Sequence, residues 1–177
     1  LWCISAYNGM VTKQEGATTA LADVQATYQR RADLLPNLTK TVKAYAAHEK
    51  ETFDAVTKAR AEATQIKLDA DNMTPEKVAA FQKAQGNVAS ALGRLMAIAE
   101  NYPELKANEN FRELQVQLEG TENRINEARQ KYNAAVQTYN QTVRTMPNAL
   151  VAGLFGFEKM EKFEAAAGAE KAPELDL

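Results

Sequence analysis

Apolar side chains return every three or four residues along one long stretch of the chain, which runs from Phe111 to Met146. Five heptads stay in phase over this stretch, diluted only by Thr121 and Thr142. The spacing predicts one continuous helix of about 55 Å at 1.5 Å per residue, with a narrow stripe to bury against other helices. The residues of the stripe are Phe111, Leu114, Leu118, Ile125, Ala128, Tyr132, Ala135, Tyr139 and Met146.

The same spacing runs from Tyr7 to Ile66, but Pro36 falls in its middle. A proline inside a helix removes a hydrogen bond and clashes with the preceding turn. Two outcomes are therefore open. The chain reverses near residues 31–35, with Asp33 capping a new helix, or one helix of about 90 Å runs through with a kink. The unbroken phase favours the kink, whereas similar helix lengths elsewhere favour the reversal.

Further helix boundaries are marked by local signals. Residues 67–72 form a polar loop, and Thr74-Pro75 then supplies an N-cap hydroxyl and a proline at the first helical position. That helix ends at residues 101–103, and either Asn108 or Asn110 starts the long helix. Few glycines and prolines favour helices over sheet. We expect an all-α fold, an elongated antiparallel bundle of three to four long helices, with four-helix up-and-down topology preferred and a short C-terminal apolar tail.

Composition excludes several classes of function. The net charge of −2 gives no basic excess to bind nucleic acid. One cysteine, Cys3, permits no intramolecular disulfide, and one histidine, His48, excludes a histidine-rich metal site. We find no glycine-rich phosphate loop and no paired carboxylates that spacing singles out. We therefore expect no enzyme, no catalytic residues, no cofactor and no metal.

The chain opens on Leu1-Trp2-Cys3-Ile4, an apolar run that suits the last turn of a membrane helix. Trp2 and Tyr7 would then lie at the membrane interface, where aromatic side chains gather. We accordingly divide the chain into the end of an N-terminal membrane helix (1–6), a helical bundle (7–147) and a C-terminal apolar segment with its tail (148–177). A lipidated Cys3 and a simple frayed helix end are the rival interpretations.

One charged group falls on an apolar stripe. Arg31 takes a core-facing heptad position, where an unpaired charge is very unfavourable. We expect a structural polar core of Arg31 and Asp33 with glutamates of the long helix, of which Glu119 and Glu122 are preferred and Glu127 is a further candidate. A buried ion pair that fixes register is the first interpretation. A polar pocket for an anionic ligand or lipid headgroup is the second.

Apolar residues crowd together again after residue 148, interrupted by two glycines. The segment folds back over the core, docks on a neighbouring subunit, or lies at a lipid interface. We take it as an interaction or membrane segment, with Leu150, Leu154, Phe155, Phe157 and Phe163 as its candidate residues.

Several motifs, taken in order along the chain, resemble those of the LemA family. They are Tyr7-Asn8-Gly9-Met10-Val11, the run from Tyr28 to Leu38, the run from Val42 to Glu49, the run from Tyr102 to Asn108, the run from Leu118 to Ile125, the run from Ala128 to Asn133, and Gly153-Leu154-Phe155-Gly156-Phe157. The resemblance covers nearly the whole chain. It implies a bacterial protein with a single N-terminal transmembrane helix and a helical body, and it supplies no catalytic residues.

These observations lead to two expectations of function. The first is a membrane-anchored bacterial scaffold that forms homo-oligomers, because anchoring raises the effective concentration of the helices. The second is a membrane-tethered adaptor, or membrane-remodelling protein, whose C-terminal segment binds a partner protein or lipid. Either would reside at the bacterial cell membrane.

Overall fold

The computed structural model describes residues 1–163, and within them every regular element is helical. The expectation of an all-α protein is confirmed. The elements are α1 (Trp2–Lys43), α2 (Lys50–Gln65), a single 3-10 turn (Ala70–Asn72), α3 (Pro75–Glu100), α4 (Pro103–Ala107), α5 (Glu109–Arg144) and α6 (Asn148–Phe155).

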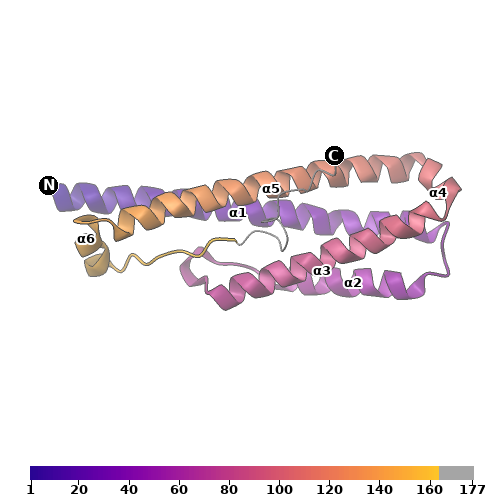
Figure 1. Cartoon of the computed structure of the whole chain (residues 1–177), viewed down its shortest axis with the longest axis horizontal. Helices are drawn as coiled ribbons and strands as arrows, with labels where there is room; N and C mark the ends of the chain where they lie inside the picture. The colour runs from indigo at the N-terminus through magenta and orange to yellow at the C-terminus, as the bar shows by residue number, and fades with distance from the viewer. Residues whose placement is uncertain (164–177) are drawn as a thin grey trace, which may run out of the picture.

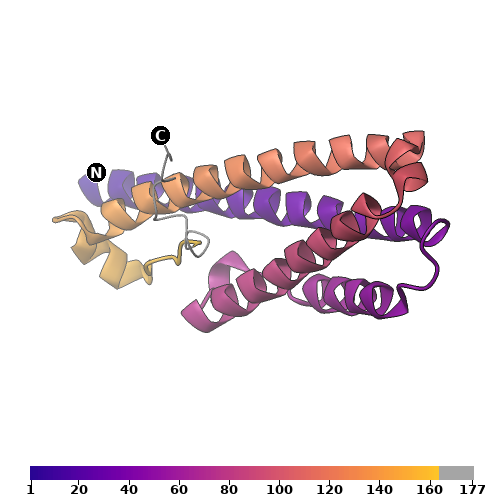
Figure 2. The ribbon, with the colours of Figure 1, turned by 45° about the vertical axis from the view of Figure 1, so that its right-hand side comes forward.

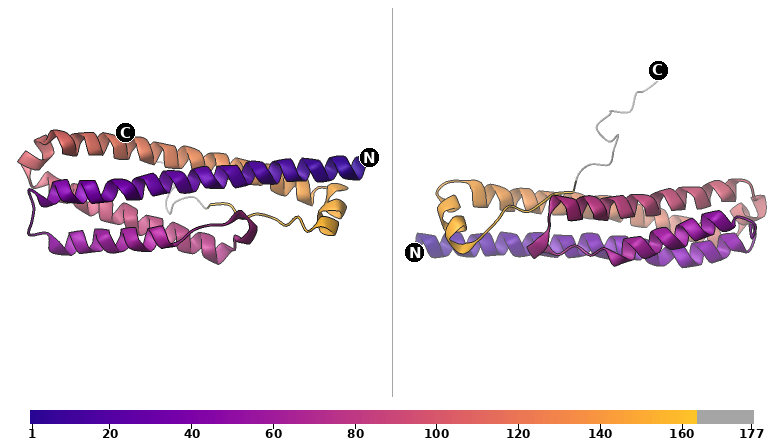
Figure 3. Two further views of the ribbon diagram at one scale, coloured as in Figure 1. Left: turned by 180° about the vertical axis from the view of Figure 1, so that it is seen from behind. Right: turned by 90° about the horizontal axis from the view of Figure 1, so that it is seen from below.

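The molecule is a rod built on its two longest helices. Helices α1 and α5 lie side by side along its length, while α2 and α3 pair with each other and pack beside the second half of α1 (Figures 1 and 2). The short α6 lies at the end of the rod where the chain begins (Figure 3). The helices are unequal, with 42 residues in α1, 16 in α2, 26 in α3 and 36 in α5, so similar lengths were a poor guide to the chain reversals.

Helix α1 continues through Pro36, so the reversal expected near residues 31–35 is wrong. The 90 Å alternative is also wrong, because α1 ends at Lys43 after about 63 Å. Pro36 has no N–H for the carbonyl of Ala32, one turn earlier. Arg60 of α2 donates its Nε–H to that carbonyl at 3.1 Å instead. A side chain from the neighbouring helix therefore satisfies the acceptor that the proline leaves open.

The predicted helix starts are largely those of the structure. The Thr74 hydroxyl accepts a hydrogen bond from the backbone N–H of Lys77 at 3.2 Å, and Pro75 is the first residue of α3. Of the two asparagines proposed for α5, Asn108 is the cap, and it accepts from the N–H of Phe111 at 3.0 Å. Asn108 also donates to the hydroxyl of Tyr45 at 2.9 Å, which ties the turn after α1 to the start of α5.

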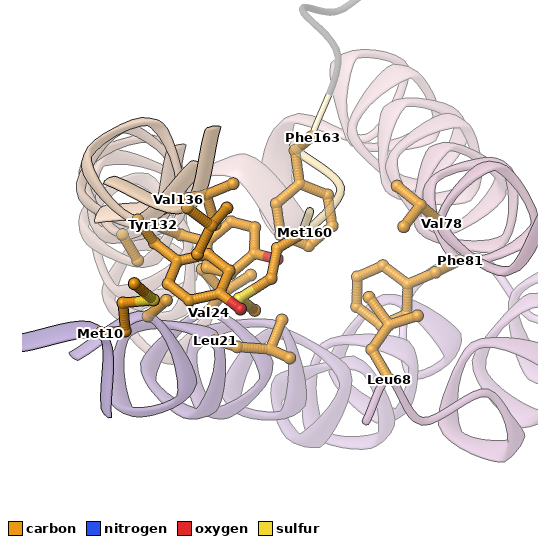
Figure 4. Close-up of a cluster of buried hydrophobic side chains, with 14 of the residues drawn as sticks. Met10, Leu21, Val24, Leu68, Val78, Phe81, Tyr132, Val136, Met160 and Phe163 are labelled. Carbon is orange, nitrogen blue, oxygen red and sulfur yellow. The ribbon is translucent and has the colours of Figure 1, made fainter. Parts of the chain in front are cut away.

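Two apolar clusters fill the rod, one behind the other. The proximal cluster, at the end where the chain begins, packs α1 and α5 with α6 and the start of α3; it includes Met10, Leu21, Val24, Phe81, Tyr132, Val136, Tyr139, Val151 and Phe163. Figure 4 shows part of this cluster, with Phe81 of α3 beside Phe163. The distal cluster packs the second half of α1 with α2, α3, α4 and the start of α5, and includes Leu35, Leu38, Val56, Val88, Leu95, Leu105 and Phe111. The seam between them crosses α1 between Tyr28 and Leu35.

Candidate functional site

Exposed large apolar side chains gather at one end of the rod. Among the described residues nine such side chains are exposed, and eight of them lie at the start of α1, just after α5, or on α6: Leu1, Trp2, Ile4, Tyr7, Met146, Leu150, Leu154 and Phe155. We call this surface the apolar end. Leu154 is 82% exposed and Phe155 is 59% exposed, so these side chains project into solvent and are not partly covered core residues. The ninth residue, Val116, lies far along α5.

The apolar end is held in place by contacts beneath it. Val151 and Ala152 of α6 are buried in the proximal cluster. The ring of Tyr7 packs edge-on against Phe155, with centroids 4.9 Å apart, and against Phe157 at 5.5 Å. These contacts join the first turns of α1 to α6, which are more than 140 residues apart in sequence. The part of the surface around Tyr7 and α6 is therefore held together by contacts between distant segments.

Charge is absent from the two segments that form this end. Residues 1–12 and residues 145–157 contain no Asp, Glu, Lys or Arg. The first charged residues beyond them are Lys13 on α1, Arg144 at the end of α5, and Glu158 and Lys159 after α6. The apolar end is thus an uncharged cap with a charged border.

Beyond α6 the chain runs back along α5 as an extended segment, residues 157–163, which we call the strap. Gly156, with φ of 74°, ends α6 in the left-handed conformation that glycine adopts readily. Asn140 of α5 donates to the carbonyl of Met160 at 3.0 Å and accepts from its N–H at 2.8 Å. Asn133, two turns earlier, does the same for Phe163, at 2.9 Å in both directions. Each side-chain amide thus pairs with both the N–H and the C=O of one residue of the strap, as a neighbouring β-strand would. These bonds hold the strap on the helix.

Two tyrosines beside these asparagines have different surroundings. The Tyr132 hydroxyl donates to the carbonyl of Glu161 in the strap at 2.8 Å. The Tyr139 hydroxyl is buried without a hydrogen-bond partner among the residues that the structure describes. Burial raises the pKa of both hydroxyls above the ordinary value of 10.0, with a smaller contribution from Glu161 at Tyr132 and Glu158 at Tyr139. Both therefore stay neutral at physiological pH.

Arg31 lies in the seam between the two apolar clusters and is 3% exposed. Its guanidinium donates from Nη1 to Oε1 of Glu122 at 3.0 Å, and from Nη2 to the carbonyl and Oε1 of Gln85, both at 2.9 Å. The ring of Tyr28 lies 5.2 Å from the guanidinium carbon. The cluster joins α1, α3 and α5 at one level of the rod and leaves Nε of Arg31 buried without a partner among the described residues.

The structure brings only part of the expected polar core together. Arg31 and Glu122 meet, but Asp33 is exposed and accepts a hydrogen bond from Gln29 at 2.9 Å. Glu119 is exposed on α5, and Glu127 pairs with Lys131 at 3.0 Å on the same helix. Asp33 lies two residues from Arg31, on another side of the helix, so it cannot reach the seam.

The expected apolar tail divides into two parts. Leu150, Leu154 and Phe155 are exposed at the apolar end, next to Trp2 and Tyr7. Phe163 is buried against the rings of Phe81 and Tyr132. Phe157 is half-buried between the two parts. The segment beyond residue 163, included in the same expectation, lies outside the described residues.

Reasoning from the sequence missed Asn133, Asn140 and Gln85. A signal for the first two exists, because a Tyr-Asn pair recurs after one heptad, at 132–133 and at 139–140. The repeat puts two amides on one side of the long helix, close to its apolar stripe. Gln85 carries no such signal, since only the fold places its side chain opposite Arg31.

Catalytic groups do not converge within the residues that the structure describes. Cys3 is exposed at the apolar end, whereas His48 is exposed in the turn beyond the other end of α1. Within residues 1–163 no cluster of three or more His, Cys, Asp or Glu side chains is placed to bind a metal ion. In the same residues, no helix combines the length and the apolar character needed to cross a bilayer.

The geometry defines an elongated helical protein with one apolar end and a buried arginine bridging its helices. Residues 20–177 match the LemA family, and the chain belongs to that family. It is also 30% identical to the magnetosome protein MamQ of Magnetospirillum gryphiswaldense, over 92% of this chain and 66% of the relative. It is 29% identical to the magnetosome proteins MamQ 1 and MamQ 2 of Paramagnetospirillum magneticum, over 89% of this chain and 64% of each relative. The chain therefore spans slightly less than two thirds of the length of these relatives.

Proposed function

We propose that this protein is a bacterial scaffold, anchored to a membrane through the start of α1 at its apolar end, whose helical rods associate with one another and carry out no catalysis. The observation that carries the proposal is the uncharged apolar end, which is built from two distant parts of the chain. An apolar surface bordered by charged residues marks a site of contact with membrane or protein. Membership of the LemA family supports a membrane setting.

Anchoring would occur through the start of α1. This part of the helix is uncharged up to Lys13, and Trp2 and Tyr7 are the aromatic residues favoured where a chain enters the interface. A single-pass anchor leading into α1 would set the rod with its apolar end towards the lipid. The relatives are magnetosome proteins by name, and a role at such an organelle is a narrower form of this proposal.

Membrane attachment is tested on the complete gene product in its bacterial host. We expect the protein to remain in the membrane pellet after carbonate washing at high pH and to be released by detergent. Release by carbonate would contradict an integral anchor. Recovery of the protein in the soluble fraction of the lysate, before any wash, would contradict the membrane assignment altogether.

Self-association would use the side of the rod. A groove of about 610 Å³ lies between α3 and α5 and is lined by Leu92, Gly93, Met96 and Leu118, with Glu119 and Glu122 at its border. A second rod could insert apolar side chains there. Tethering all copies at one end raises their effective concentration and favours such side-by-side contacts.

The groove can be tested with one arginine and a matched control. A Cβ added at Gly93 meets nothing within 4 Å, and the same holds for Gly16 on α1, which lies outside the groove. We expect Gly93→Arg to shift the detergent-extracted protein to smaller particles in light scattering, with Gly16→Arg unchanged. A monomeric wild type over the accessible concentration range would refute self-association. Unchanged particle size for Gly93→Arg would exclude this groove as the contact.

The exposed face of α6 favours an adaptor as the second candidate function, in which Leu150 and Leu154 bind a partner protein. Removing residues 148–177 is a poor test, because Val151 and Phe163 belong to the proximal cluster. Substituting Leu150 and Leu154 by Gln spares that cluster. An adaptor would lose its partner and keep its oligomeric state, whereas a scaffold assembled through this end would lose the oligomer.

A further inference from the structure

A second feature accompanies the apolar end, and the proposed function does not use it. A groove of about 680 Å³ runs between the last turns of α5 and the strap. Three cationic side chains line it, Arg144 from α5 with Lys159 and Lys162 from the strap, against one carboxylate, Glu161. All three cations are exposed, and none makes a hydrogen bond or ion pair with another described residue.

The position of this basic groove relative to α6 is fixed by the strap. Asn140 grips Met160, so Lys159 and Lys162 lie beside α5 about one turn or more behind Arg144. Arg144 in turn is the last residue of α5, at the border of the uncharged segment 145–157. Arg144 therefore directly follows the apolar side chains along the rod, and Lys159 and Lys162 lie behind it along the same groove.

Helix α6 has apolar side chains on opposite faces. Val151 and Ala152 face the proximal cluster, while Leu150, Leu154 and Phe155 face outwards. A helix that is apolar all round is buried in protein or in lipid. Aromatic side chains at its border and cations just behind are the arrangement that an interfacial, anionic lipid surface stabilises.

A second copy of the chain suits this end less well. Two copies meeting end to end would bring the same basic grooves towards each other, and like charges would repel. An anionic bilayer instead attracts these cations while it accepts the apolar side chains.

We propose that the apolar end inserts into the headgroup region of an anionic bilayer, with Leu150, Leu154 and Phe155 entering the lipid and Arg144, Lys159 and Lys162 binding headgroup phosphates. This inference rests on the membrane setting of the proposed function. It concerns α6 and the strap, and it does not require an anchor at the start of α1. It assigns to the protein a second, peripheral membrane contact beside the start of α1.

The test uses the purified 177-residue chain, whose single tryptophan, Trp2, reports from the apolar end. Vesicles of phosphatidylcholine alone are compared with vesicles that also contain phosphatidylglycerol. We expect a blue shift of Trp2 emission and co-sedimentation on the anionic vesicles, weakening as salt screens the charges. No binding to anionic vesicles would overturn the inference.

Two sets of variants separate the apolar and the cationic contributions. Leu150→Gln with Leu154→Gln should weaken binding about tenfold or more, because two leucine side chains no longer enter lipid. Val116→Gln, the matched control at the exposed apolar residue outside this end, should bind as wild type. Replacing Arg144, Lys159 and Lys162 by Gln should weaken binding to anionic vesicles about tenfold or more and leave binding to neutral vesicles unchanged.

Other results contradict the inference without touching the proposed function. Equal binding by the Leu150/Leu154 variant would show that α6 does not enter lipid. A wild-type dimer in light scattering that this variant dissolves, with no vesicle binding, would assign the surface to a second copy. In both cases carbonate-resistant attachment of the complete gene product can persist, so failure of the inference remains distinguishable from failure of the anchor.

Discussion

At the scale of single residues, buried polar side chains determine where the helices meet. Arg31 is held by Glu122 and Gln85. The two members of the ion pair, Arg31 and Glu122, are not equally buried. The side chain of Arg31 is 4% exposed and that of Glu122 is 45% exposed. Glu122 can therefore be hydrated if its partner is lost, whereas Arg31 cannot.

This asymmetry predicts unequal effects of removing either partner. Glu122→Leu leaves a buried guanidinium without its counter-ion and should destabilise by about 3 kcal/mol or more. Arg31→Met leaves a carboxylate that reaches water, removes the donor to the Gln85 side chain, and should destabilise by about 1–2 kcal/mol. Urea denaturation measures both. The double variant should resemble Arg31→Met, and Lys131→Met, which breaks an exposed pair, should change stability by less than about 0.5 kcal/mol.

The paired tyrosines offer a second residue-scale prediction. Tyr132→Phe removes the bond to the strap and should destabilise by about 1 kcal/mol. Tyr139→Phe removes a buried hydroxyl without a partner among the described residues and should be neutral or stabilising. Since burial raises the pKa of both hydroxyls, folding stability should fall as pH rises above about 10, and each variant should flatten that fall in alkaline thermal melts. Equal losses for the two variants would contradict this account.

At the scale of elements, sequence periodicity located the helices but not all of their ends. The phase across Pro36 correctly favoured a continuous helix, yet the same phase continues into α2 and hid the end of α1 at Lys43. What makes Pro36 tolerable is Arg60, which is 28 residues away from Ala32 in sequence. A bond of that range depends on the packing of α2 against α1, so no local pattern predicts it.

The bond from Arg60 leads to a double-variant prediction. Arg60→Met should destabilise by about 1–2 kcal/mol, because the buried carbonyl of Ala32 loses its donor. Pro36→Ala restores a backbone N–H at that carbonyl and should stabilise α1. In the Pro36→Ala protein the effect of Arg60→Met should shrink by about 1 kcal/mol, measured as the coupling energy of the cycle. Additive effects would show that the two sites are independent.

The position of the strap could not be predicted from the sequence. Apolar crowding after residue 148 predicted an interaction segment, but not which part folds back. The division at Phe157 depends on Asn133 and Asn140, whose amides bind Met160 and Phe163 from another element. An extended segment has no periodicity of its own, so its position is decided by the helix that binds it.

At the scale of the whole molecule, two clusters in series suggest that the rod opens in parts. Helices α2 and α3 pack mainly on each other and on the second half of α1. The proximal cluster instead unites α1, α5 and α6 with the first turns of α3, through Val78 and Phe81. Local opening of α2 and of the later turns of α3 should therefore leave the apolar end intact, as long as the first turns of α3 stay packed.

Two matched substitutions test this division. Leu95 of the distal cluster and Leu21 of the proximal cluster are both buried, and either Leu→Ala change should destabilise by about 2–5 kcal/mol. Leu95→Ala should speed amide exchange mainly in α2 and α3. Leu21→Ala should speed it mainly in α6 and the adjoining turns of α1 and α5. Uniform acceleration by both would indicate one cooperative unit.

The length of α1 has a consequence for what each end of the rod can sense. Trp2 and Lys43 are separated by about 63 Å of helix, several times the roughly 8 Å over which salt screens charges in cells. A change of charge at one end of the rod therefore has no direct electrostatic effect at the other end. A charged partner bound at the turn around α4 would therefore have no direct electrostatic effect on the surroundings of Trp2.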